Sequence, residues 1–421
     1  MEIDKLYKLY ALHPEICIDT RKIIRGCIFF SLKGDNFNGN QFAHSALDNG
    51  AAYAVIDELE YDTDNRCILV ENVLVCLQNL ANYHRHQLKI PVISLTGSNG
   101  KTTTKELCRD VLAKKYRVEA TMGNLNNHIG VPLTILNARR DTEILLVEMG
   151  ANHQGEIDAL CTIANPDYVM ITNIGKAHLE GFGGLEGIKK GKSEMYRYAT
   201  MHQKKIFINT DDDTLISLLP PKAETIRYSA SELIEIIAEE PYLTIKYKSQ
   251  TLKTKLYGAY NQPNIAFAVA AGQYFHIGDD DISEAIRSYT PENNRSQIVG
   301  KGSNTFIKDA YNANPSSMKL SIESFNKLRA ENKVLILGDM LELGDHADEE
   351  HRQIIKLTQN LGFEKVIFIG RLFNSVALPN FGKYFTDIKD AKEYFDDQNY
   401  KNSTIFLKGS RGIAVEKLIS D

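Results

Sequence analysis

The feature that most constrains the fold is an apolar run that ends in a glycine-rich loop and continues as a helix. Residues 89–97 (KIPVISLTG) have the β-branched and aliphatic composition of a buried strand. Residues 101–116 then place apolar side chains at the spacing of one helix face. A strand, a tight loop and a helix in this order direct backbone N–H groups toward a bound phosphate. The segment therefore predicts a phosphate-binding loop.

The loop sequence TGSNGKTTT (96–104) has the residue types that this chemistry requires. Gly97 and Gly100 permit a tight turn, Lys101 supplies a cation for the β- and γ-phosphates, and the Thr102 hydroxyl suits Mg²⁺. The strict G-x-x-x-x-G-K-[ST] pattern is not met because Leu95 occupies its first position, so a plain Gly/Ser turn before a helix remains the alternative. The predicted nucleotide-binding residues of the loop are Gly97, Ser98, Asn99, Gly100, Lys101, Thr102 and Thr103.

Strand-like and helix-like segments alternate along most of the chain, which favours parallel sheets with helices on both faces. A period-two stretch at 243–258 breaks the alternation and predicts a hairpin, and 261–275 predicts a helix. After the polar stretch 291–297 a third strand–helix series begins. We predict an α/β protein with three domains. These are a small N-terminal α/β domain (1–88), a central P-loop-type domain with a mainly parallel sheet (89–298) and a C-terminal Rossmann-like α/β domain (299–421).

Composition narrows the function classes. The net charge of −5 over 421 residues gives no electrostatic reason to expect a nucleic-acid partner. No apolar run of about 18 residues occurs, so we expect neither secretion nor a membrane span. The six cysteines form no C-x-x-C pair and favour free thiols in a reducing cytoplasm. They are Cys17, Cys27, Cys67, Cys76, Cys108 and Cys161.

Three further candidate side chains belong to the central domain. One lies at the end of a predicted strand, one in the loop after the next strand and one in the helical segment that follows. Glu148 lies near the carboxyl end of the apolar run 143–150. In a parallel sheet it is then at the same edge as the phosphate loop, which makes it a candidate Mg²⁺ ligand. His178 stands in a glycine-bounded loop after the next strand, and Lys192 lies in the following helical segment, near 186–199. The alternatives are a solvated strand-end carboxylate, a structural histidine and an exposed lysine face.

The strings GSNGKT, GKAHLEG and KKGKSE are similar to those of the Mur ligase and folylpolyglutamate synthetase superfamily. This resemblance implies an ATP-dependent enzyme that binds two Mg²⁺ ions through Thr102, Glu148, His178 and Lys192. It implies that His178 contacts the second ion and that Lys192 is carbamylated, which would turn an ammonium into an oxygen ligand. The catalytic residues that the resemblance implies are Lys101, Lys192, His178 and Arg295.

The strings DAYNANPSSM (309–318) and LGDMLELG (337–344) resemble the family member that adds D-alanyl-D-alanine to UDP-N-acetylmuramoyl-tripeptide. The resemblance then implies that both molecules are substrates and that the reaction passes through an acyl-phosphate of the tripeptide. The resemblance assigns Asp309 to the ATP ribose and Arg295 to the γ-phosphate. It assigns Asn312 and Asn314 to the dipeptide, because an amide offers both a donor and an acceptor.

Two further segments complete the implied site. GAYNQPN (258–264) is similar to a family G-x-H-N-x-x-N segment, so Asn261 and Asn264 are candidate adenine contacts, with Tyr260 in place of the usual histidine. The remaining candidates for the UDP-sugar and the acceptor peptide are Thr20, Arg21, Lys33, Gly34, Asn126 and Asn127. Asn38-Gly39-Asn40 stands where D-G-H is usual in the family.

Three rival functions are considered. A sibling ligase would share the loop, Glu148, His178 and Lys192 but not the two third-domain strings. A nucleotide-dependent switch protein would need a guanine-reading N-K-x-D, which does not occur, and a dead scaffold would be expected to have lost Lys101 or Glu148. We expect a monomeric cytoplasmic enzyme, and the third residue of the acceptor peptide is left open.

Overall fold

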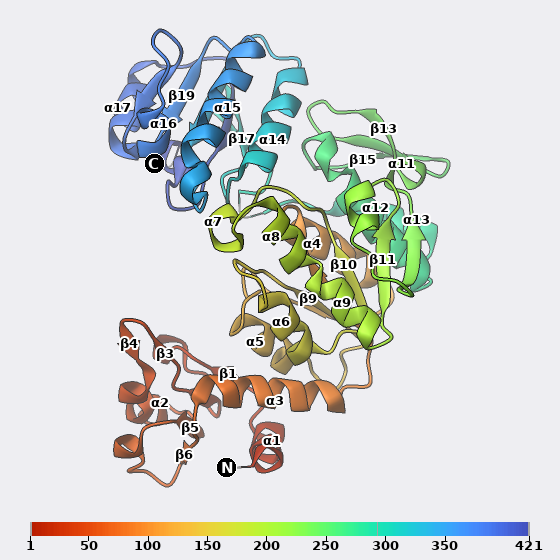
Figure 1. The fold of residues 1–421 in the computed structure, drawn as a ribbon, viewed down its shortest axis with the longest axis vertical. Helices are drawn as coiled ribbons and strands as arrows, with labels where there is room; N and C mark the ends of the chain where they lie inside the picture. Colours follow the sequence, from red (N-terminus) through yellow and green to blue (C-terminus); the bar gives the residue numbers. More distant parts are fainter. Residues whose placement is uncertain (1, 293, 420–421) are drawn as a thin grey trace.

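The computed structural model describes residues 2–292 and 294–419. Three sheets follow one another along the longest axis of the molecule, with the N-terminal sheet at one end, the C-terminal sheet at the other and the central sheet between them (Figure 1). Within the described residues no helix has both the length and the apolar character needed to cross a membrane.

The first sheet is small and parallel. Its strand order is β1-β2-β5-β6, and helix α3 leads from it toward the central sheet (Figure 1). The elements of this part are α1 (Ile3–Leu12), β1 (Ile16–Cys17), β2 (Ile28–Phe30), β3 (Lys33–Gly34), β4 (Phe37–Asn38), α2 (Ala43–Asp48), β5 (Tyr53–Ile56), β6 (Cys67–Leu69) and α3 (Val73–Gln87). Short 3₁₀ turns lie at Thr20–Lys22, Gly39–Phe42 and Leu59–Tyr61.

The central sheet has six parallel strands in the order β12-β11-β10-β7-β9-β8. Its strands are β7 (Val92–Thr96), β8 (Val118–Ala120), β9 (Ile144–Glu148), β10 (Tyr168–Ile171), β11 (Lys205–Asn209) and β12 (Glu224–Tyr228). Its helices are α4 (Lys101–Leu112), α5 (Gly130–Asn137), α6 (Glu156–Ala164), α7 (Leu179–Phe182), α8 (Leu185–Lys192), α9 (Glu194–Met201), α10 (Asp213–Ser217), α12 (Gln262–Tyr274) and α13 (Asp279–Ser288).

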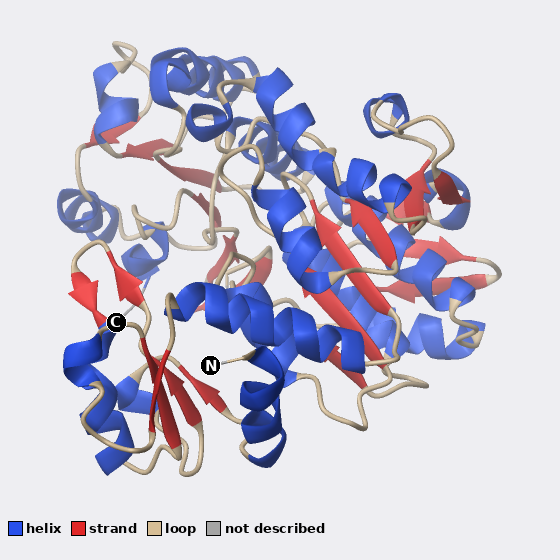
Figure 2. Cartoon of the chain, turned by 60° about the horizontal axis from the view of Figure 1, so that its bottom comes forward, coloured by secondary structure: helices blue, strands red, loops and turns tan. Residues whose placement is uncertain are grey.

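Alternate side chains of this sheet enter two separate apolar layers. Val92 packs on one face with helices α5, α6 and α9, whereas Ile93 packs on the other with α4, α12 and α13. Both faces are therefore covered by helices, as Figure 2 shows, and the carboxyl ends of the strands remain the open edge of the sheet. The predicted hairpin is part of a small antiparallel sheet of β13 (Glu235–Ala238), β14 (Thr244–Tyr247) and β15 (Gln250–Lys253), beside helix α11 (Ala230–Leu233).

The third sheet has the order β16-β17-β21-β18-β19-β20, parallel except for β16. Its strands are β16 (Gln297–Lys301), β17 (Asn304–Lys308), β18 (Lys333–Gly338), β19 (Val366–Ile369), β20 (Lys383–Phe385) and β21 (Thr404–Lys408). Its helices are α14 (Pro315–Lys327), α15 (Ala347–Asn360), α16 (Arg371–Ser375) and α17 (Ile388–Asp397), with 3₁₀ turns at Gly344–His346 and Val415–Ile419. A further 3₁₀ turn, Ala259–Asn261, directly precedes α12 of the central part.

The predicted α/β class and parallel sheets are confirmed. The single helix expected near 186–199 is instead two helices, α8 and α9, which meet at Ser193. The hairpin gains a third strand, β13, which the sequence pattern did not reveal. Strand β16 begins at Gln297, and the division of the chain into 1–88, 89–298 and 299–421 stays a prediction.

Candidate active site

The phosphate loop lies between β7 and α4, and two of its glycines could hardly be replaced. Gly97 has φ +145°, and a Cβ there would lie 1.9 Å from the Thr172 hydroxyl oxygen. Gly100 has φ +78°, and a Cβ there would lie 2.5 Å from Asn264 Oδ1. Both positions combine left-handed backbone with close neighbours, which only glycine tolerates. The neighbouring segment therefore sets the shape of the loop.

Residues 172–175, after β10, hold the loop by hydrogen bonds. The Thr172 hydroxyl donates to Asn99 O at 2.6 Å, and the Asn99 N–H donates to Asn173 Oδ1 at 3.1 Å. Ser98 Oγ and Gly175 exchange hydrogen bonds of 2.9 Å in both directions. Thr172 and Asn173 were not among the predicted site residues, although they belong to the same TNIG segment that precedes His178. Pairing of β10 with β7 brings the two segments together.

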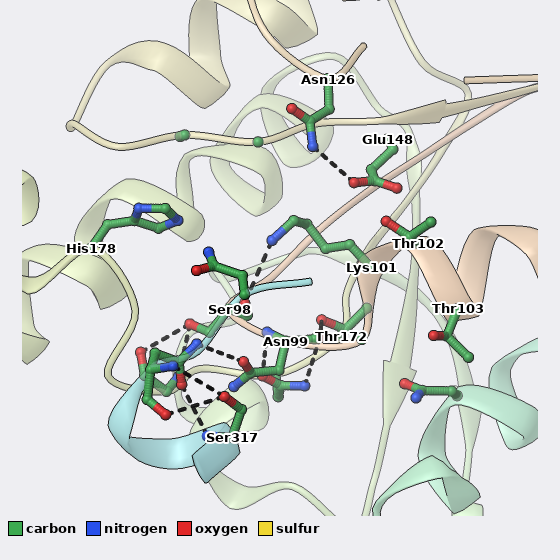
Figure 3. A pocket seen from close by; sticks show the side chains of 18 of the residues that line it. Ser98, Asn99, Lys101, Thr102, Thr103, Asn126, Glu148, Thr172, His178 and Ser317 are labelled. Carbon is green, nitrogen blue, oxygen red and sulfur yellow. Dashed lines mark hydrogen bonds between the residues drawn. The ribbon is translucent and has the colours of Figure 1, made fainter. Parts of the chain in front are cut away.

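One cavity of about 1230 Å³ opens beside this loop (Figure 3). It extends to α3 and α6 on one side and to the beginning of α14 on the other. It brings together most of the predicted residues from the central and C-terminal parts of the chain. Those that line it are Ser98, Asn99, Gly100, Lys101, Thr102, Thr103, Asn126, Asn127, Glu148, His178, Asn261, Asn264, Arg295, Asp309, Asn312 and Asn314. Gly97 and Lys192 belong to the loop and to α8 beside it and are not part of the lining.

Glu148, at the carboxyl end of β9, is buried, and only one of its two carboxylate oxygens has a hydrogen-bond partner. Asn126 Nδ2 donates to its Oε1 at 2.8 Å, whereas its Oε2 is buried without a hydrogen-bond partner. Its backbone N–H donates to the Thr121 hydroxyl at 2.9 Å. Figure 3 shows Glu148, Thr102 and Lys101 directed toward the same space. A buried carboxylate oxygen without a partner is costly unless a cation approaches it.

The residues therefore fit a Mg²⁺ ion that takes part of its ligands from outside the protein. Glu148 Oε2 and the Thr102 hydroxyl are hard oxygen ligands of the kind that Mg²⁺ prefers. Among residues 2–292 and 294–419, no three His, Cys, Asp or Glu side chains form a group that could hold a metal ion. Phosphate oxygens and water would have to complete the coordination, which is usual for Mg²⁺ at a nucleotide.

Lys101 and Lys192 are two lysines near the same end of the sheet. Lys101 Nζ donates to Gly97 O at 2.7 Å, and burial together with the charge of Arg295 lowers its pKa, against the opposing effect of Glu148. Lys192 is fully buried in α8, donates to Ala151 O at 3.2 Å and lies 5.2 Å from the centre of the Phe182 ring. Burial, reinforced by Lys101, lowers the pKa of Lys192 well below its usual value.

His178 links the central part of the chain to the C-terminal part. It has left-handed backbone (φ +57°) just before α7, and its Nδ1 contacts the Glu342 carboxylate. This contact lowers the pKa of the Glu342 carboxyl. Nearby, Lys176 Nζ lies 2.5 Å from Glu350, a buried carboxylate on α15, and the Lys176 N–H donates to Ser316 Oγ at 2.9 Å. The loop that carries His178 is thus held against the third sheet.

The segment after β17 reaches the phosphate loop directly. Asn314 caps α14 and donates from Nδ2 to Asn99 Oδ1 at 2.7 Å. Asp309 accepts hydrogen bonds from Lys408 Nζ at 2.6 Å and from Ser321 Oγ at 3.0 Å. Asn312 is exposed at the cavity. Lys408, which also lines the cavity, was missed because its partner Asp309 follows a different strand, β17, and is 99 residues away in the sequence.

The predicted adenine contacts lie at the start of α12. Asn264 Oδ1 accepts from the Thr104 hydroxyl at 3.0 Å, and its Nδ2 donates to Asn261 Oδ1 at 2.8 Å. Tyr260, which stands in place of the family histidine, forms a 2.8 Å hydrogen bond with Ser296, and burial raises its pKa well above the usual value. Tyr260 also lines the cavity, so a phenol ring stands where the family histidine is expected.

The first-domain candidates lie outside this cavity. Arg21, beside Thr20 in a 3₁₀ turn, pairs with Asp19 at 2.8 Å. Lys33, next to Gly34 in β3, contacts Asp57 at 2.8 Å and Glu58 at 2.7 Å. The two asparagines that replace the usual D and H bind the same carboxylates, since Asn40 donates to Asp57 and Asn38 donates to Glu58. The role of these residues toward a UDP-sugar stays a prediction.

Comparison with known proteins finds the Mur ligase middle domain at residues 95–272 and the Mur ligase, glutamate ligase domain at residues 294–411. The chain is 35% identical to the UDP-N-acetylmuramoyl-tripeptide--D-alanyl-D-alanine ligase of Bacillus subtilis, covering 99% of this chain and 94% of the relative. It is 29% identical to the Escherichia coli ligase of the same name, covering 96% and 92%.

Two solved structures have a similar fold along nearly the whole chain. A crystal structure of MurF from Acinetobacter baumannii superposes with a TM-score of 0.86 at 29% identity, covering 96% of this chain and 92% of that one. MurF ligase from Thermotoga maritima in complex with ADP gives a TM-score of 0.85 at 26% identity, covering 96% of each chain.

Proposed function

The chain belongs to the Mur ligase family, and from this premise we propose that it is an ATP-dependent ligase that joins D-alanyl-D-alanine to UDP-N-acetylmuramoyl-tripeptide. Relatives of that name match it over almost its full length, and a similar structure was solved with ADP. The observation that carries the proposal is the 2.7 Å contact of Asn314 with Asn99, because it joins the acceptor-specific YNANP segment to the phosphate loop.

In the first step, a terminal carboxylate oxygen of the tripeptide attacks the γ-phosphorus of ATP, the bond to the bridging oxygen breaks, and ADP leaves. The protein has to hold the two anions together and to neutralise their charge. Lys101 and Arg295 are the cations that this chain supplies beside the cavity. Mg²⁺, when bound through Glu148 and Thr102, supplies further positive charge at the phosphate oxygens.

In the second step, the amine of D-alanyl-D-alanine attacks the acyl carbon. The amide C–N bond forms, the bond from carbon to the phosphate oxygen breaks, and inorganic phosphate leaves together with one proton from the amine. Water must be kept out because it would hydrolyse the acyl-phosphate. The pairs Lys176–Glu350 and His178–Glu342, which hold the third sheet against the cavity, support a closed working state.

Several finer points are proposals that rest on family membership. We assign 1–88 to the UDP-sugar, 89–298 to ATP and catalysis, and 299–421 to the dipeptide and ATP. Two Mg²⁺ ions and a carbamylated Lys192 belong to the proposed holoenzyme. Full burial and a lowered pKa favour an uncharged Lys192 amine, which is the form that reacts with CO₂. Cytoplasmic location is proposed because both substrates are charged, soluble molecules. The monomeric state stays a prediction.

The test is phosphate release by the purified full-length chain. It should require ATP, Mg²⁺, UDP-N-acetylmuramoyl-tripeptide and D-alanyl-D-alanine together, and omission of any one should reduce the rate to background. Free L-alanine, D-glutamate and diaminopimelate, the amino acids that sibling ligases would add, replace the dipeptide in parallel assays. Release that is as fast with one of them as with the dipeptide would contradict the proposed acceptor. Product mass then identifies the amide.

A further inference from the structure

Two arginines share the ring of one tyrosine that lines the cavity. The guanidinium carbon of Arg295 lies 3.6 Å from the centre of the Tyr311 ring, and that of Arg411 lies 5.6 Å from it. Tyr311 stands between Asp309 and Asn312, and Arg411 comes from the loop after β21. Arginine is suited to such stacking because its charge is planar and weakly hydrated.

Neither arginine is neutralised by a carboxylate. Among residues 2–292 and 294–419, no Asp or Glu forms an ion pair with Arg295 or Arg411. Lys408, three residues before Arg411, is in contrast engaged by Asp309 at 2.6 Å. Two guanidinium groups without a carboxylate partner thus lie at Tyr311: Arg295 lines the cavity, and Arg411 lies outside its lining, at the ring of a residue that belongs to it. The lysine beside them already has its counter-charge.

The backbone that presents Arg411 is fixed by its neighbour. Ser410 is buried, its N–H donates to Asp339 O at 3.0 Å, and its hydroxyl accepts from the Leu341 N–H at 2.9 Å. The same hydroxyl lies 3.4 Å from Ala313 O, in the segment that carries Tyr311. Arg411 itself is exposed, so its side chain is held at the ring from a rigid base while its guanidinium remains accessible.

We infer that Arg411, positioned by Tyr311, receives the terminal carboxylate of the incoming dipeptide; this inference rests on the proposed function. The dipeptide amine has to reach an acyl-phosphate whose phosphate lies at Lys101 and Arg295. Its carboxylate then lies about 7 Å away, the span of two extended residues. The two guanidinium carbons lie 3.6 and 5.6 Å from the same ring centre, and the upper limit that these distances set on their separation is larger than this span. A guanidinium binds a carboxylate by paired charge-assisted hydrogen bonds.

The experiment compares D-alanyl-D-alanine with its C-terminal amide, which keeps the reacting amine and loses the carboxylate. In the unmodified enzyme the amide should have a KM about 10- to 100-fold higher. Arg411→Ala should raise the KM for D-alanyl-D-alanine by a similar factor and should no longer distinguish the two acceptors. The KM for ATP should not change, and Arg411→Lys should restore part of the discrimination.

Matched variants separate the roles of ring and charge. Tyr311→Phe keeps the ring and should retain discrimination, whereas Tyr311→Ala should raise the dipeptide KM as Arg411→Ala does. Arg329→Ala, at a side chain that is 93% exposed and remote from the cavity lining, is the control and should behave like the unmodified enzyme. If Arg411→Ala still prefers the free carboxylate by the original factor, the inference is wrong. If the unmodified enzyme does not use D-alanyl-D-alanine at all, the proposed function itself is wrong.

Discussion

Asn126 binds one oxygen of the Glu148 carboxylate at 2.8 Å and leaves the other oxygen buried without a partner. Asn126 comes from the loop between β8 and α5, and Glu148 from the end of β9. The amide therefore orients the carboxylate so that Oε2 faces the cavity beside Thr102. A polar contact of this kind tunes a metal ligand without touching the metal.

Asn126→Ala is expected to raise the Mg²⁺ concentration for half-maximal phosphate release about 10- to 100-fold, because the carboxylate loses its orienting partner. A titration of initial rates against Mg²⁺ measures the effect. Asn127→Ala is the matched control, because the Asn127 side chain accepts from the Gly130 N–H at 2.9 Å and not from Glu148. An unchanged Mg²⁺ midpoint for Asn126→Ala would contradict the orienting role.

Lys192→Ala is expected to lose most of the activity, and short-chain carboxylates added to the assay should restore part of it. The reason is that a small carboxylate can occupy the place proposed for the carbamate. Lys190→Ala changes an exposed lysine of the same helix. Its activity should equal that of the unmodified enzyme and should not change when the carboxylate is added. Full activity of Lys192→Ala without any addition would sink the carbamylation proposal.

Acidification is expected to destabilise the protein through His84. This side chain is buried, its Nε2–H donates to Ala138 O at 3.0 Å, and its Nδ1 lies 3.1 Å from the Tyr7 hydroxyl. Burial lowers its pKa. The folded form therefore stays neutral where the unfolded form, with a pKa of about 6.5, binds a proton. The contribution is fully present above pH 6.5 and is lost as the pH falls through the lower folded value.

The measurement is the free energy of unfolding in urea at pH 7.5 and at pH 5.5. His84→Gln should be less stable at pH 7.5 but should show a smaller loss between the two pH values than the unmodified protein. His86→Gln changes an exposed histidine of the same helix and should keep the original pH dependence. Parallel curves for all three proteins would show that His84 does not carry the effect.

Lys176→Met is expected to shift the molecule toward an open arrangement, because it removes the ion pair with Glu350 on α15. Lys176 is 38% exposed, so the pair is worth about 1 kcal/mol or less, equivalent to at most about a fivefold change in the closed fraction. Small-angle scattering should give a larger radius of gyration, and the KM for ATP should rise by a similar factor.

The control for closure is Lys189→Met. Lys189 pairs with Glu186 within the same helix at 2.7 Å, so its loss leaves the contact between the second and third sheets intact. Both values should match the unmodified protein. Equal radii for Lys176→Met and the unmodified chain would show that this ion pair does not hold the two parts together.

The local sequence was sufficient to predict the phosphate loop. Strand, turn and helix are contiguous there, and the residue requirements at Gly97 and Gly100 are imposed by backbone conformation as well as by neighbours. The position of Glu148 followed from the same logic, because the ends of neighbouring parallel strands share an edge. Periodicity predicted many of the strands but missed several short or peripheral ones, among them β13, β16 and β20, and the break between α8 and α9.

The burial of individual side chains could not be predicted from the sequence. Lys190 and Lys192 are two residues apart in one basic stretch, yet the first is exposed and the second fully buried. Two residues apart in α8, they point to nearly opposite faces of the helix, and the packing of α8 over Phe182 decides which face is buried. Lys33 likewise fitted a phosphate contact by its charge, and the structure pairs it with Asp57 and Glu58.

The sequence by itself determined the loop chemistry, the α/β class and the strings that indicate the Mur ligase family, because these depend on contiguous residues. Only the tertiary structure decided which distant residues share the site. The contacts of Asn99 with Asn314 and of Tyr311 with Arg411 join segments that no local pattern connects. They form because the segment after β17 and helices α14 and α15 of the C-terminal part lie against the loops at the carboxyl ends of the central strands, and both parts line one cavity.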